Sequence, residues 1–98
     1  MKERELQTIV KDKLIKEGYT YWFPPRTWGE RDIMGVFDFI AAKGKKVIFV
    51  QITTIQHVSE RVKKIQNFYR LNNVGPFRDV FVWGYRADKK VFKIQRVI

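Results

Sequence analysis

The run from Lys46 to Thr54, KVIFVQITT, constrains the fold of this chain more than any other stretch. Apolar, mostly β-branched residues occupy both of its alternating faces, which is typical of a strand that is covered on both sides. The run from Val36 to Lys43 is also strand-like, and Gly44-Lys45 between the two runs predicts a hairpin turn. Because both faces of this hairpin need cover, the sequence predicts a small three-layer α/β domain.

The segments around the hairpin supply the covering helices and the remaining strands. Apolar residues recur at helical spacing within Glu3–Glu17, and Ser59 is a candidate N-cap for a second helix that runs to about Asn72. Further strands are expected at Tyr19–Phe23, Asp79–Ala87 and Val91–Ile98. The predicted order is α-β-β-β-α-β-β, with a mixed central sheet flanked by helices, in one domain of residues 1–98.

The charge of the chain favours a polyanionic partner. Twenty lysines and arginines stand against ten acids in 98 residues, which gives a net charge of +10 at neutral pH. Such an excess on a small domain is typical of nucleic-acid binding, although a solvated basic surface without a ligand is the alternative. The predicted nucleic-acid contacts are Arg26, Arg31, Lys43, Lys45, Arg61, Lys63 and Lys64.

Composition also excludes several kinds of site. The chain contains no cysteine, so disulfides and thiolate metal sites are excluded. No apolar run approaches the roughly 20 residues that span a bilayer, and the N-terminal residues lack the apolar core of a secretory signal. We therefore expect a cytoplasmic protein with no membrane partner.

Two polar residues interrupt the apolar hairpin. Asp38 lies in the first run and Gln51 in the second, and such groups are costly to bury unless they are paired or bind a ligand. The tight turn at Gly44 brings them onto neighbouring strands, within reach of one another. Carboxylate and amide oxygens suit Mg²⁺ (or Mn²⁺), and a metal on a basic domain indicates phosphodiester hydrolysis.

At these residues the chain resembles the PD-(D/E)XK nuclease superfamily and, within it, the archaeal Holliday-junction resolvases. The resemblance is carried by Glu3-Arg4-Glu5-Leu6, by Asp38 in GVFDFIAA, and by Gln51-Ile52-Thr53 in VIFVQITT. It implies a restriction-endonuclease-like fold and a Mg²⁺-dependent endonuclease. The substrates implied are duplex or branched DNA, and the assembly implied is a homodimer.

The chain departs from the family pattern at two positions. Gln51 replaces the glutamate of the E-x-K motif, and Thr53 replaces its lysine. A subgroup with D-x-x-G-x-F-D followed by Q-x-T-T also resembles this stretch, so Asp32 can supply the missing carboxylate. The resemblance then implies Asp38, Gln51 and Asp32 as metal ligands, with Glu3 as an alternative anchor and Thr53 at most orienting water. The positive charge that the lysine supplies in the family could come here from Arg31, Arg61 or Lys63.

Each of these residues also has a structural explanation. Asp38 can form a buried ion pair, and Gln51 can bond to the main chain at the end of the sheet. Asp32 can belong to a turn before Gly35, and Glu3 can complement the helix N-terminus. Two functional alternatives stay open beside the nuclease: a catalytically inactive nucleic-acid-binding module with the same fold, and a protein-interaction subunit whose aromatic residues line an interface.

Overall fold

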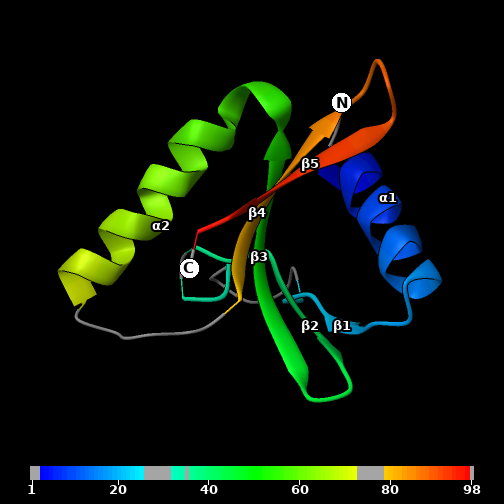
Figure 1. Cartoon of the computed structure of the whole chain (residues 1–98), viewed down its shortest axis with the longest axis horizontal. Helices are drawn as coiled ribbons and strands as arrows, with labels where there is room; N and C mark the ends of the chain where they lie inside the picture. The colour runs from blue at the N-terminus through cyan, green and yellow to red at the C-terminus, as the bar shows by residue number, and fades with distance from the viewer. Residues whose placement is uncertain (1–2, 26–31, 35, 73–78, 98) are drawn as a thin grey trace.

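A central five-stranded sheet lies between two helices in the computed structural model, which describes residues 3–25, 32–34, 36–72 and 79–97 (Figure 1). The elements in chain order are α1 (Glu3–Lys16), β1 (Thr20–Trp22), β2 (Phe39–Lys43), β3 (Lys46–Thr54), the 3₁₀-helix η1 (Ile55–His57), α2 (Val58–Asn72), β4 (Val80–Arg86) and β5 (Val91–Arg96). Neither helix of the described ranges is long and apolar enough to cross a membrane. The predicted element order and the three layers are confirmed.

The strands lie in the sheet in the order in which they occur along the chain. The pairs β1/β2, β2/β3 and β4/β5 are antiparallel, whereas β3 and β4 are parallel. Parallel neighbours need a crossover connection, and η1 with α2 provides it on one face of the sheet. The predicted mixed sheet is therefore confirmed, and its parallel pair lies at the centre.

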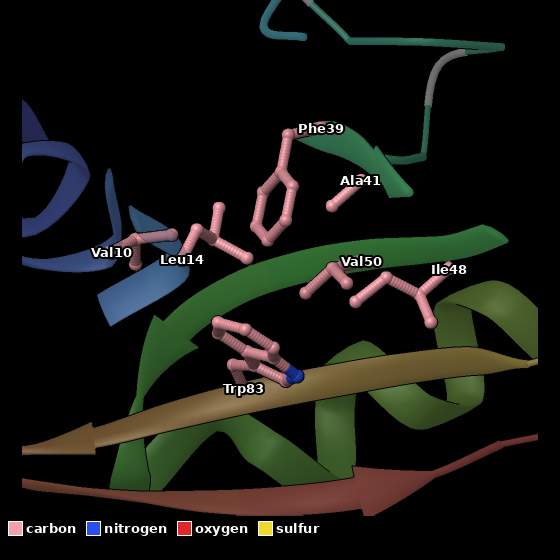
Figure 2. Packing of buried hydrophobic residues seen from close by; sticks show 7 residues of the cluster. All are labelled: Val10, Leu14, Phe39, Ala41, Ile48, Val50 and Trp83. Atoms are coloured by element: carbon pink, nitrogen blue, oxygen red, sulfur yellow. The ribbon is translucent and has the colours of Figure 1, made fainter. Parts of the chain in front are cut away.

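The face of the sheet under α1 holds the first apolar cluster. Val10 and Leu14 reach from α1 toward Phe39 of β2, with Val50 of β3 and Trp83 of β4 beside them (Figure 2). The Phe39 ring is fully buried, and its centroid lies 5.5 Å from that of Trp83 in an edge-on arrangement. Burial of one such ring stabilises the fold by about 1.5–3 kcal/mol. Phe39 directly follows Asp38, so this packing also fixes the backbone at the candidate site.

The opposite face of the sheet is covered by α2. Its buried cluster combines Val58 and Ile65 of the helix with Val80 and Val82 of β4, and Phe37 packs among them. Every one of these five side chains is at most 6% exposed. Both faces of the central strands are thus covered, as the apolar run of β3 predicts.

The predicted strand from Val36 starts later, at Phe39, so that boundary was wrong. The chain forms a tight turn first: the Ile33 carbonyl accepts hydrogen bonds from the N–H groups of Val36 (3.1 Å) and Phe37 (3.0 Å). Met34 in this turn has a φ of 55°, which is incompatible with a strand. Val36 and Phe37 pack under α2 instead of pairing with β3.

Ser59 is not the N-cap of the second helix. The chain is already helical in η1, and the N–H of Val58 donates to the carbonyl of Ile55 there. Because η1 runs directly into α2, Ser59 lies inside the first turn, where no extended capping position exists. The end of the helix, at Asn72, is as predicted.

Lys43 connects the β2–β3 hairpin to the end of α1. Its ammonium group donates to the carbonyl oxygen of Glu17 at 2.7 Å and lies 5.7 Å from the centre of the Tyr19 ring. A cation here complements the helix C-terminus. We expect Lys43→Met to lower the free energy of unfolding by about 0.5 kcal/mol, since the bond is exposed. Urea unfolding would measure this, with Lys45→Met as the control; equal effects of the two changes would contradict the assignment.

Candidate functional site

A depression of about 400 Å³ opens where β2 begins, beside the carboxyl-terminal half of β3, and we refer to it as the Asp38 depression. It is bordered by the first turns of α1, by the carboxyl-terminal half of β3, by η1 and by α2. Its lining residues are Leu6, Asp32, Asp38, Gln51, Ile52, Thr53, Thr54, His57, Arg61 and Lys64. All of the predicted catalytic residues whose side chains are described therefore lie around one hollow.

Asp38 is held in this depression by the backbone of β3. Its N–H donates to the carbonyl of Val50 at 2.9 Å, and its Oδ2 accepts the N–H of Ile52 at 2.7 Å. The carboxylate thus takes the place of a backbone carbonyl one residue before β2 begins and extends the pairing with β3. A carboxylate offers about four lone-pair positions, so this bond does not exhaust its capacity to bind a cation.

Gln51 and Thr53 lie on the face of β3 that α2 covers, because they alternate with the α1-facing residues Val50 and Ile52. Gln51 is 3% exposed and Thr53 is 7% exposed. The Gln51 Oε1 atom is buried and has no hydrogen-bond partner among the described residues. A buried acceptor in this state costs about 1–3 kcal/mol, so the site is suited to a ligand that brings a donor or a cation.

The α2 border of the depression is basic. Arg61 is half-buried and Lys64 is exposed, and both line the hollow, whereas Lys63 is exposed and does not line it. Two carboxylates, Asp32 and Asp38, line the same depression. The depression therefore combines carboxylate oxygens with cationic groups.

The remaining predicted site residues lie elsewhere or outside the described ranges. Lys43 pairs with Lys46 at the far end of the hairpin, five residues along β3 from Gln51, or about 17 Å away. The adjoining turn residue Lys45 is equally remote. Arg26 and Arg31 lie outside the described residues. Glu3 begins α1, but its side chain is likewise outside the description.

Four residues that line the depression were not predicted as site residues: Leu6, Ile52, Thr54 and His57. From the sequence, Leu6 is expected on the buried stripe of the first helix, and the single histidine, His57, is expected at the surface. His57 lies in η1, and its Nδ1 is 3.2 Å from Oε2 of Glu60. The signal that could have found Thr54 and His57 is the parallel crossover after β3, because ligands bind at the carboxyl ends of parallel strands.

The described residues contain no group of three or more histidine, cysteine, aspartate or glutamate side chains that could hold a metal ion. The donor set of the depression is smaller: the carboxylates of Asp32 and Asp38 and the amide oxygen of Gln51. Mg²⁺ commonly binds through one or two carboxylates and keeps several waters, so these oxygens fit it, although the neutral Gln51 weakens the site.

Comparison with protein-family models, with curated proteins and with solved structures finds no match to this chain.

Proposed function

We propose that this protein is a metal-dependent endonuclease that hydrolyses phosphodiester bonds of DNA at the Asp38 depression. The observation that carries the proposal is the convergence of Asp38, Gln51 and Asp32 with the cations Arg61 and Lys64 around one hollow. The net charge of +10 supports a polyanionic substrate. The proposal also places the protein in the cytoplasm, with DNA as its partner.

Each side chain has a distinct task in this proposal. Asp38 and Gln51 would hold the metal through their oxygens, with Asp32 as a further carboxylate. The hydrogen bond from Ile52 keeps the Asp38 carboxylate aimed at the depression. When bound, Mg²⁺ supplies positive charge to the phosphate and acidifies water. The hydroxyl of Thr53 orients water on the same face of β3, and Arg61 with Lys64 binds the phosphate.

Cleavage assays test the proposal directly. Linear, nicked and four-way-junction DNA would each be incubated with the protein in Mg²⁺, in Mn²⁺ and in EDTA. We expect metal-dependent cutting that EDTA abolishes. A preference for the junction would support branched DNA as the substrate and a homodimer as the acting species, because a two-fold symmetric enzyme matches paired cuts.

A specific observation favours a second candidate, a nucleic-acid-binding module without activity. Gln51 and Thr53 are both uncharged at the centre of the depression, where the implied mechanism needs an acid and a cation. This alternative predicts DNA binding that weakens with salt and no cutting in either metal. For each tenfold rise in salt concentration, the logarithm of the binding constant should fall by about 0.9 for every phosphate contact. The cleavage assay therefore separates the two functions.

Gln51→Glu is expected to strengthen metal binding. The change adds a third carboxylate to the depression. Its attraction to a divalent cation exceeds the desolvation cost of the new carboxylate, so the affinity for the cation should rise by about tenfold. The Mg²⁺ concentration for half-maximal cleavage should fall accordingly. Gln66→Glu, an exposed position on α2, is the matched control. Equal Mg²⁺ requirements in the two variants would argue against Gln51 as a metal ligand.

A further inference from the structure

Two side-chain atoms that belong to the Asp38 depression are buried and have no hydrogen-bond partner among the described residues. They are Oε1 of Gln51, an acceptor, and Nε of Arg61, a donor. The first belongs to β3 and the second to α2, which covers the face of β3 on which Gln51 lies. Unpaired buried polar atoms are rare in folded proteins, and two of opposite type at one site indicate a ligand with both an acceptor and a donor or cation.

The helix geometry explains why Arg61 reaches this position. At about 100° per residue, Arg61 lies within about 60° of the stripe formed by the buried residues Val58 and Ile65. Lys64 lies farther round, at the rim, and Lys63 points almost away from the sheet. Arg61 is therefore the most deeply placed of the three α2 cations predicted to contact nucleic acid.

We infer that Arg61 is the phosphate-binding cation of this site and that it takes the task which the neutral Thr53 cannot perform. This inference rests on the proposed function and deepens it. The ligand it would take is a phosphodiester oxygen, which accepts from the Nε–H and a terminal N–H of the guanidinium. The cation or water that accompanies the phosphate satisfies Gln51 Oε1. The positive charge of the site thus comes from α2 instead of β3.

A purely structural role makes a different prediction. If Arg61 and Gln51 turned toward each other in the free protein, the Nε–H would donate to Oε1, and both atoms would be paired without a ligand. Loss of Arg61 would then lower the melting temperature and leave DNA binding unchanged at temperatures where the protein is folded.

The test compares Arg61→Gln and Arg61→Lys with Lys63→Gln, which removes the same charge from the outer side of α2. Binding of a short labelled DNA duplex would be measured by fluorescence anisotropy in EDTA over a range of salt concentrations. We expect Arg61→Gln to weaken DNA binding by about tenfold. The slope of log K against the logarithm of the salt concentration should become less steep by about 0.9. Lys63→Gln should change both the affinity and this slope by less. Arg61→Lys should regain part of the affinity, because it keeps the charge and loses the planar fork.

Melting curves of all three variants ensure that binding is measured on folded protein. Equal binding by Arg61→Gln and Lys63→Gln would overturn the inference, and so would a lower melting temperature with unchanged affinity. If the wild type binds DNA but never cuts it, the hydrolytic proposal fails, and the anisotropy data still decide the role of Arg61. If cutting depends on Asp38 while Arg61→Gln cuts and binds normally, the inference fails and the nuclease proposal stands.

Discussion

Replacing Asp38 by asparagine is expected to reduce metal-dependent cleavage by at least about a thousandfold while leaving the fold intact. The loss is expected because the proposed function makes the carboxylate a ligand of the metal, and charge stabilisation by a bound metal is worth several kcal/mol in the transition state. The fold should persist because the asparagine oxygen can still accept the Ile52 N–H, which is 2.7 Å from Asp38 Oδ2. Cleavage rates and melting temperatures would be measured on the same preparations.

The hydrogen bond from Ile52 makes alanine the poorer test at this position. Asp38→Ala would remove the acceptor and leave a half-buried N–H without its partner, which costs about 1–3 kcal/mol. Its loss of activity could then come from the fold alone. Asp12→Asn, an exposed change on α1, is the matched control for the loss of one negative charge. Cleavage by Asp38→Asn at the rate of this control would remove Asp38 from the proposed site.

Much of the fold could be predicted from the hydrophobic pattern because that pattern is strong in the centre of the chain. The run VIFVQIT is apolar on both faces, and this feature alone requires a layer of cover on each side. The turn at Ile33–Phe37 could not be predicted, since it depends on a positive φ at Met34, a residue with no preference for that conformation. The start of α2 could not be predicted either, because the 3₁₀ turn η1 leads into the helix and no side chain caps it.

The candidate site was predictable in part. Asp38 and Gln51 stand out because each is polar within an apolar strand, and the hairpin register brings them to one depression. The basic residues could not be sorted from the sequence, because charge alone does not say where a side chain points. The structure separates Arg61, which lines the hollow, from Lys43, which bonds to the carbonyl of Glu17 at the end of α1.

Gly84 is the position where the smallest substitution should have the largest effect on stability. It lies in β4 opposite Thr53, and a Cβ atom there would be 2.3 Å from Cγ2 of Val58 and 3.4 Å from the Cα of Ile55. Val58 is buried and β-branched, so its side chain has little freedom to turn away, and the backbone of Ile55 cannot yield. We expect Gly84→Ala to lower the free energy of unfolding by about 1–3 kcal/mol.

The double variant Gly84→Ala/Val58→Ala identifies the cause of that loss. If the new methyl group collides with Val58, the double variant should be more stable than the sum of the single changes predicts, by about 0.5–3 kcal/mol. Denaturant unfolding of the four proteins measures this coupling, and strict additivity would mean that the clash lies elsewhere. Gly84 closely approaches Val58, the first residue of α2, and Arg61 follows Val58 by less than one helical turn. Weakened DNA binding by folded Gly84→Ala, recovered in the double variant, would therefore link this packing contact to the proposed phosphate-binding role of Arg61.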